Sequence, residues 1–180
     1  PPDSGRRSWS VRHDLGLRKV VISLPADKVL AVETLPAVCW SLESGTFDSA
    51  LENGERYFCL TPDGMSCVVG LVELRIQSLQ DGASARLLRG HQKQVLSAMF
   101  CGPNRLLTGA CDRTARVWDV DKALCLQVLQ GHRDFVTCVD YSSETGLVLT
   151  GSNDGTARSW GLKTGEFFVE MVEGAAVQAV

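Results

Sequence analysis

Apolar and polar residues alternate over short runs along much of the chain, and each run ends at a cluster of Gly, Asn, Asp, Ser or Pro. This pattern is typical of half-buried β-strands joined by tight turns. No run has the length and the 3.6-residue period of a helix. In the clearest stretch, the turns lie at 142–146, 153–155 and 163–165. They separate four predicted strands, at 136–141, 147–152, 156–161 and 166–173.

The same pattern continues upstream and becomes weaker toward the N-terminus. Turn residues stand at Gly102-Pro103-Asn104 and at Asp112-Arg113, in the places that match the turns of the last stretch. Short strands separated by short turns fold most simply as an antiparallel meander. The earlier strands are predicted at 19–24, 28–33, 37–42, 47–51, 56–61, 66–70, 74–78 and 85–89.

An internal repeat underlies this pattern, because residues 87–119 can be laid over residues 128–161. The dipeptide Gly90-His91 recurs at Gly131-His132 after a period of about 40–45 residues. Trp118 recurs at Trp160 after a similar interval, and the string Asp-x-Thr-Ala-Arg starts at both Asp112 and Asp154. Separate anchors with one period indicate a repeat architecture.

Gly-His followed by Trp-Asp, and again by Trp-Gly, resembles the WD40 repeat family, closely over 86–174 and loosely over 19–85. The resemblance implies a β-propeller in which each repeat supplies the outer strand of one blade and the three inner strands of the next. We therefore expect an all-β, WD40-type β-propeller segment of about four blade units. Its expected parts are a linker or strand remnant at 1–18, two degenerate repeats at 19–85, well-formed repeats at 86–127 and 128–173, and the start of a further blade at 174–180.

The resemblance also implies a buried network in each well-formed blade. In an antiparallel meander, the turn before the first strand and the turn after the second lie on one face, so the His and the Asp can meet. A Thr hydroxyl can accept from a buried indole N–H and donate to an imidazole, and a carboxylate can hold the imidazole tautomer. The expected tetrads are His91, Thr108, Asp112 and Trp118 in one blade and His132, Thr150, Asp154 and Trp160 in the next.

Several positions depart from the family pattern. The two upstream repeats lack Gly-His, and Ser78 stands where the Trp is expected. Trp40 falls on a predicted third strand, where core packing is the simplest interpretation, whereas Trp9 lies in the expected linker and could be core or a partner anchor. Ala175 stands where the next His should be, and Gly161 replaces the Asp that follows the first Trp.

Composition narrows the class of protein. The chain is 44% hydrophobic and 22% charged, which is ordinary for a globular protein, and it has no apolar run long enough to span a bilayer. A net charge of −3 without a basic block argues against nucleic-acid binding. The 7 cysteines lie at irregular gaps with no C-x-x-C pair, so neither a disulfide framework nor a zinc site is expected. With no apolar leader, a reducing cytoplasmic or nuclear setting fits best. Because Pro1 replaces an initiator Met, a fragment, processed or short form is expected.

His, Asp and Thr meeting in one place could also suggest a hydrolase triad. The set occurs twice at one period, however, and a hydroxyl bonded to a buried indole is a poor nucleophile. We therefore expect a non-enzymatic protein-protein interaction scaffold without cofactor or metal. The alternative is a substrate-recognition subunit of a multiprotein complex such as a ubiquitin ligase. Some WD40 receptors of that kind carry an Arg two residues after the Trp-Asp pair, where this chain has Asp121 and Lys163.

The expected partners are other proteins or peptides, and further blades of a longer chain. Propeller loops from successive blades gather on the face that carries the tetrad turns, so partner binding is expected there. The tetrads do not need every side chain of those loops. The candidate partner-binding residues are Gln92, Lys93, Arg113, Arg133, Asp134, Phe135 and Asn153, with Arg113, Arg133 and Phe135 as the favoured hot spots.

Overall fold

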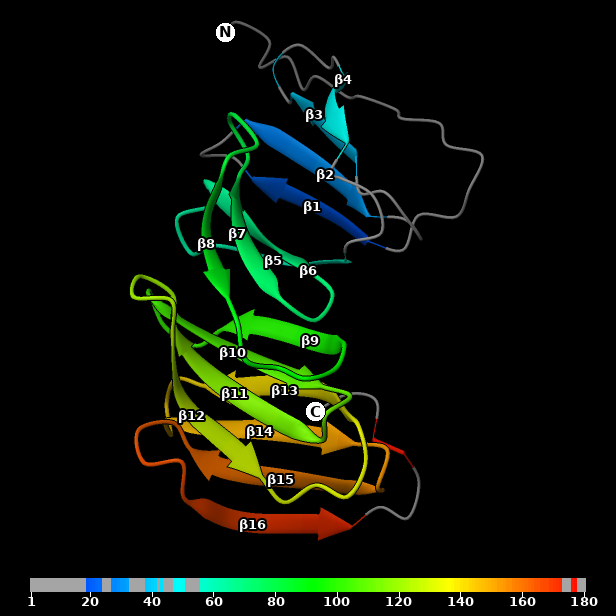
Figure 1. The fold of residues 1–180 in the computed structure, drawn as a ribbon, viewed down its shortest axis with the longest axis vertical. Helices are drawn as coiled ribbons and strands as arrows, with labels where there is room; N and C mark the ends of the chain where they lie inside the picture. The colour runs from blue at the N-terminus through cyan, green and yellow to red at the C-terminus, as the bar shows by residue number, and fades with distance from the viewer. Residues whose placement is uncertain are drawn as a thin grey trace, which may run out of the picture.

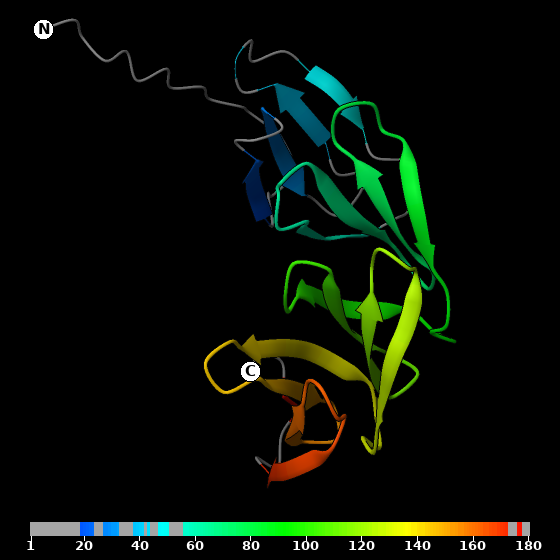
Figure 2. The same ribbon diagram turned by 90° about the vertical axis from the view of Figure 1, so that its left-hand side faces the viewer.

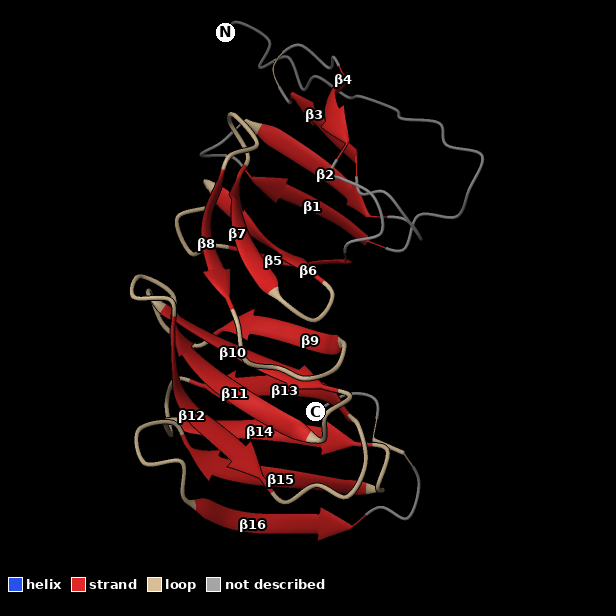
Figure 3. Cartoon of the chain, in the orientation of Figure 1, coloured by secondary structure: helices blue, strands red, loops and turns tan. Residues whose placement is uncertain are grey.

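The computed structural model describes residues 19–23, 27–32, 38–41, 43, 47–50, 56–172 and 176–177, and every regular element within them is a strand (Figure 3). This confirms the predicted all-β class. None of the described residues forms a helix that could cross a membrane. The expected linker at 1–18, with Trp9, and Ala175 lie outside the described residues. The strands are β1 (Lys19–Ser23), β2 (Lys28–Val32), β3 (Val38–Ser41), β4 (Phe47–Ala50), β5 (Arg56–Leu60), β6 (Ser66–Gly70), β7 (Leu74–Ser78), β8 (Ser84–Leu88), β9 (Val95–Phe100), β10 (Arg105–Ala110), β11 (Thr114–Asp119), β12 (Leu124–Gln130), β13 (Val136–Ser142), β14 (Leu147–Ser152), β15 (Thr156–Gly161) and β16 (Phe167–Val172).

These strands form four antiparallel sheets of four strands each, and each sheet is a simple meander. In chain order the sheets are β1–β4, β5–β8, β9–β12 and β13–β16. They follow one another along the long axis, with β1–β4 and β13–β16 at opposite ends (Figures 1 and 2). The predicted segment of about four blade units is confirmed, and Trp40 lies on β3, the third strand of its sheet.

Strand β10 is buried on both faces from Leu106 to Ala110, which explains why most of its residues are apolar. Successive side chains of a strand point to opposite faces of the sheet. Leu106 and Ala110 therefore belong to one core cluster, while Leu107 belongs to the next. Both Leu106 and Leu107 are fully buried, so the sheet β9–β12 is packed between two neighbours.

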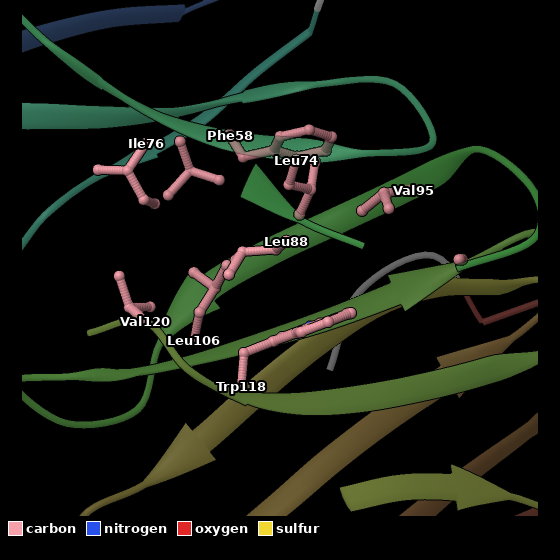
Figure 4. Packing of buried hydrophobic residues seen from close by; sticks show 10 residues of the cluster. Phe58, Leu74, Ile76, Leu88, Val95, Leu106, Trp118 and Val120 are labelled. Atoms are coloured by element: carbon pink, nitrogen blue, oxygen red, sulfur yellow. The ribbon is translucent and has the colours of Figure 1, made fainter. Parts of the chain in front are cut away.

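The core thus lies between the sheets. Between β5–β8 and β9–β12, Phe58, Leu74 and Ile76 pack toward Leu106 and Trp118 (Figure 4). Between β9–β12 and β13–β16, the second cluster contains Leu107, Val117, Leu129, Val136, Val148 and Trp160. This face-to-face packing holds the successive turns in a fixed order along both edges of the array.

The sheet β5–β8 corrects one position of the sequence alignment. Leu79 N–H donates to the Met65 carbonyl, as Val120 N–H donates to that of Asn104, so Leu79 and Val120 are equivalent. Gln77 stands two residues before Leu79, as Trp118 stands two residues before Val120. The prediction that Ser78 replaces the Trp was therefore wrong by one residue. Gln77 takes that place and is 8% exposed.

The C-terminal end shows how a following strand can begin. Val177 N–H donates to the Ser152 carbonyl over 2.9 Å. Val95, the first residue of β9, donates in the same way to the Leu71 carbonyl of the preceding sheet over 2.7 Å. Val177 is also buried. It therefore lies against β14 as the first residue of an inner strand lies against the sheet before it.

Candidate functional site

Backbone hydrogen bonds define the two faces that carry the turns. Cys111 N–H donates to the Gln94 carbonyl, and Asn153 N–H donates to that of Phe135. Each bond joins the turn between the second and third strands of a sheet to the segment that enters its first strand. We call this edge the tetrad face. On the opposite face, Val120 N–H donates to the Asn104 carbonyl, which joins the other two turns of its sheet.

In the sheet β9–β12, four side chains form one hydrogen-bonded chain. Trp118 Nε1 donates to Thr108 Oγ1 over 2.9 Å. Thr108 Oγ1 lies 2.7 Å from His91 Nε2, and His91 Nδ1 lies 2.8 Å from Asp112 Oδ2. With the Nδ1 proton on the carboxylate side, Nε2 accepts from the Thr hydroxyl, so every donor points toward Asp112. The network thereby assigns His91 as neutral imidazole.

The sheet β13–β16 repeats this arrangement. Trp160 Nε1 donates to Thr150 Oγ1 over 2.9 Å, and Thr150 Oγ1 lies 2.8 Å from His132 Nε2. His132 Nδ1 lies 3.1 Å from Asp154 Oδ2. Thr150 is 0% exposed, so its hydroxyl cannot reach a substrate in solvent. Thr108 is equally inaccessible, and the arrangement therefore holds backbone rather than offering a nucleophile.

Each carboxylate ties two turns together. Asp112 accepts from Gln92 N–H over 3.0 Å and from the Thr114 hydroxyl over 2.7 Å. Asp154 accepts from Arg133 N–H over 2.7 Å and from the Thr156 hydroxyl over 2.6 Å. Burial alone would raise the pKa of both carboxyls, but these hydrogen bonds outweigh it and lower each pKa. The turns are thus anchored to ionised, buried carboxylates.

The two Thr hydroxyls that bond the carboxylates were missed from the sequence. Thr114 and Thr156 stand two residues after Asp112 and Asp154, within the recurring Asp-x-Thr string. Asp side chains commonly bond the backbone two residues on, and both Thr N–H groups do donate to their Asp, over 3.1 Å and 2.9 Å. The repeated spacing was the available signal.

The glycine before each tetrad His has a positive φ that other residues rarely adopt, +157° at Gly90 and +145° at Gly131, and a side chain there would also meet its neighbours. A Cβ on Gly90 would lie 2.5 Å from Arg116 Nη1 and 3.0 Å from Trp118 Cη2. A Cβ on Gly131 would lie 2.2 Å from Arg158 Nη1. The recurring Arg of the Asp-x-Thr-Ala-Arg string therefore fills the space under the Gly-His turn, a second role that the sequence interpretation missed.

Acidification is expected to destabilise both tetrads. Burial lowers the pKa of His91 and of His132 below the ordinary 6.5, and the Asp partners only partly oppose this. Between pH 7.5 and 5.5 the imidazoles become protonated in the unfolded chain, whereas they stay largely neutral in the folded protein. Unfolding therefore takes up protons, and a lower pH favours it. The free energy of unfolding should fall by up to about 1.4 kcal/mol per imidazole per pH unit below 6.5. Urea unfolding of the full-length protein at pH 7.5 and pH 5.5 measures the change in the free energy of unfolding. Equal free energies at the two pH values would contradict the prediction. The double variant H91N/H132N should lose most of the slope.

All seven candidate partner-binding residues lie in turns of the tetrad face. Gln92, Lys93, Arg113, Arg133 and Asn153 are exposed, and Asp134 is partly buried. Phe135 is 39% exposed, so its ring is not packed fully under its own sheet. The structure gives Lys93, Arg113 and Arg133 no ion-pair partner among the residues it describes.

Arg113 has an unusual backbone conformation. Its φ is +69°, in the left-handed region that favours glycine, and the equivalent residue of the next sheet is Gly155 with a φ of +80°. Ala123, on the opposite face, has a φ of +53° where the next sheet has Gly165 at +71°. A side chain at such a φ costs about 1–2 kcal/mol. The chain thus carries an arginine on the tetrad face at a position where glycine would be less strained.

Other kinds of site receive no support from the geometry. No cluster of three or more His, Cys, Asp or Glu that could hold a metal ion occurs within the described part of the chain. Cys101 and Cys111 form no disulfide. The polar groups gathered on the tetrad face are turn backbones, anchored carboxylates and exposed side chains.

Four-stranded meanders packed face to face, two of them with a Trp, Thr, His and Asp chain, define a repeat protein of the β-propeller class. The WD40 family, described as "WD domain, G-beta repeat", matches residues 82–119 and 123–161, so this part of the chain consists of WD40 repeats. The first match covers β8 with β9–β11, and the second covers β12 with β13–β15. Each repeat therefore supplies the outer strand of one sheet and the three inner strands of the next.

Named relatives are similar over this same region. The chain is 38% identical over 85 residues to the DENN domain and WD repeat-containing protein SCD1 of Arabidopsis thaliana, covering 47% of this chain and 7% of the relative. It is 41% identical over 83 residues to cell division control protein 4 of Candida albicans, covering 44% and 12%. It is 38% identical over 79 residues to a guanine nucleotide-binding protein subunit beta of Arabidopsis thaliana, covering 42% and 21%. The chain therefore spans less than a quarter of each of these relatives.

Proposed function

We propose that this protein is a non-enzymatic scaffold that binds other proteins through the tetrad face. One observation carries the proposal: exposed side chains on this face project from turns whose backbones are bonded to buried, ionised carboxylates. Gln92 and Arg133 supply those backbone N–H groups, and Lys93 and Asp134 directly follow them. Turns that are already ordered lose little conformational entropy when a partner binds.

The charges on this face favour a partner with an acidic contact surface. Lys93, Arg113 and Arg133 lie on it without ion-pair partners among the described residues, although the whole chain has a net charge of −3. Burial raises the pKa of the Cys111 thiol. Lys93 and Arg56 oppose that rise and Asp112 and Asp134 add to it, so both cations and carboxylates lie near the β10–β11 turn. Charge complementarity of this kind raises association rates and specificity.

Charge reversal in the full-length protein tests the proposal. Arg113→Glu with Arg133→Glu should leave the melting temperature unchanged, because neither side chain contributes to a tetrad. Partners recovered by affinity purification and mass spectrometry should be lost. Lys122→Glu with Lys163→Glu is the matched control on the opposite face, where both side chains are exposed. Retained partners in the first variant, with loss in the control, would assign binding to the opposite face.

Arg113 permits a second test that separates binding from stability. Arg113→Gly should raise the free energy of unfolding by roughly 1 kcal/mol, because glycine adopts the positive φ without strain. It should also weaken partner binding, because Arg is a frequent hot-spot residue. Ala123→Gly is the matched control, with a similar gain in stability and unchanged binding. Equal binding by all three proteins would remove Arg113 from the proposed surface.

The alternative of a substrate-recognition subunit, as in a ubiquitin ligase, depends on the same purification. It requires ubiquitin-ligase adaptors among the recovered proteins, and their loss in the charge-reversed variant would place them at the tetrad face. Asp121 and Lys163 occupy the positions where some ligase receptors carry Arg, so the general scaffold is the better-supported function.

A further inference from the structure

A cavity of about 290 Å³ opens on the face opposite the tetrads, between the sheets β5–β8 and β9–β12. The β5–β6 turn, the β9–β10 turn and the start of the β11–β12 turn form its mouth. Its walls include Ile76 and Val120, which are 3% and 5% exposed and face each other across the same core cluster (Figure 4). The volume is at or below the lower end for small-molecule sites, so it suits a single side chain better than a larger ligand.

The charged groups at the mouth do not cancel. Arg86 lies 3.5 Å from Asp121 Oδ1, and the Asn104 amide donates to Asp121 Oδ2, so Arg86 and Asp121 offset each other. Asp63 is the remaining charge. Its Oδ1 accepts from the Thr61 hydroxyl over 2.6 Å and from Met65 N–H over 3.0 Å. These bonds lower the pKa of Asp63, which is therefore ionised at neutral pH.

Asp63 is also positioned to receive a ligand. Its Oδ1 is used by the turn itself, whereas Oδ2 has no bonding partner within the described chain. The carboxylate is exposed and lines the cavity, so Oδ2 can accept a further hydrogen bond without breaking the turn. The lining combines apolar side chains, among them Ile76, Phe100 and Val120, with polar groups and one unpaired carboxylate, and this mixture fits a long aliphatic side chain that ends in a cation.

One of the charges at the mouth, that of Asp121, is reversed at the next junction between sheets. Leu162 N–H donates to the Gly146 carbonyl as Val120 N–H donates to that of Asn104, so Lys163 is the counterpart of Asp121. The next junction therefore carries a cation where this one carries a carboxylate. Packing of the sheets alone would not require that difference.

We propose that this cavity binds a lysine or arginine side chain of a protein partner, with the aliphatic stem between Ile76, Phe100 and Val120 and the cation at Asp63 Oδ2. Such a contact would engage the face opposite the tetrads. It is independent of the proposed function, because no residue of the cavity belongs to the tetrad face.

Saturation-transfer NMR on the full-length protein tests this with the capped tripeptide acetyl-Gly-Lys-Gly-amide. Wild type should saturate the lysine methylene protons, and the norleucine tripeptide, which lacks the cation, should bind more weakly. Asp63→Asn should weaken lysine binding roughly two- to fivefold, as expected for a solvent-screened ion pair. Asn keeps an Oδ1 acceptor for Thr61 and Met65, so the melting temperature should not change.

Asp81→Asn is the matched control. Asp81 is also an exposed turn carboxylate of this face, accepts from Ala83 N–H over 3.1 Å and lies outside the cavity. It should leave lysine binding unchanged. No saturation of the lysine tripeptide, equal binding of the norleucine tripeptide, or equal losses in the two variants would each overturn the proposal. Loss of partners in the Arg113 and Arg133 variant would bear only on the tetrad face.

Discussion

Replacing either tetrad tryptophan with alanine should remove about 3–5 kcal/mol from the free energy of unfolding. Trp118 is 1% exposed and Trp160 is 3% exposed, and each belongs to a different core cluster between sheets. The substitution empties a large aromatic site and also removes the indole N–H that bonds Thr108 or Thr150. Urea unfolding of Trp118→Ala and Trp160→Ala in the full-length protein measures the loss.

Two further variants separate packing from hydrogen bonding. Trp118→Phe keeps an aromatic ring but loses the N–H donor and part of the ring volume, so it should cost clearly less than Trp118→Ala, within about 1–3 kcal/mol. Leu126→Ala truncates a large apolar side chain that is 45% exposed on β12, and it should change stability by no more than about 0.5 kcal/mol. A cost below about 1 kcal/mol for Trp118→Ala would show that the tetrad does not hold the sheet.

The second large effect concerns β16. Within the described structure β16 pairs only with β15, and all six of its residues are exposed. Met171 is 47% exposed, whereas its counterpart Leu129 on β12 is covered by the next sheet and is 2% exposed. An apolar edge strand with one open side is a site for intermolecular pairing. The 180-residue chain should therefore self-associate or aggregate.

Lysines on the edge should suppress this association. Val169 and Val172 are 53% and 72% exposed, and Val169→Lys with Val172→Lys should raise the dissociation constant at least about tenfold in sedimentation equilibrium. Ser143→Lys with Thr145→Lys adds the same charge in an exposed turn and should change little. A monodisperse, cooperatively melting monomer of the unmodified chain would contradict the prediction.

The parts of the fold that could be predicted are those with repeated anchors. Gly-His and Trp recur at one period, and the four strands of the last sheet were predicted to within a residue or two. The same anchors identified the residues that lie in each hydrogen-bonded chain. The sheet β5–β8 lacks a Trp to set the alignment, and there the interpretation was wrong by one residue, choosing Ser78 in place of Gln77.

Other features depend on contacts between separate turns, strands and sheets, and the repeat period of the sequence gives no information about such contacts. The packing of Arg116 under Gly90 is a contact between a turn and a strand, and sequence spacing alone does not show that the Arg116 guanidinium lies where a Cβ on Gly90 would be. The cavity beside Asp63 combines turns from two sheets that are far apart in sequence. A positive φ is usually indicated by glycine, as at the equivalent residue Gly155. Arg113 gives no such indication, so its conformation could not be predicted from its own residue type.

The offset between repeat and sheet has a consequence for how such a chain can change in length. A repeat contributes one strand to the sheet before it and three to the sheet that follows. Deleting one whole period, for instance residues 90–130, would join β8 directly to the turn that precedes β13. Every remaining strand would still have its partners, wherever the cut was made. Duplication by unequal crossing-over can therefore add or remove one sheet without leaving a strand orphaned, whereas the loss of half a period would leave at least one sheet incomplete.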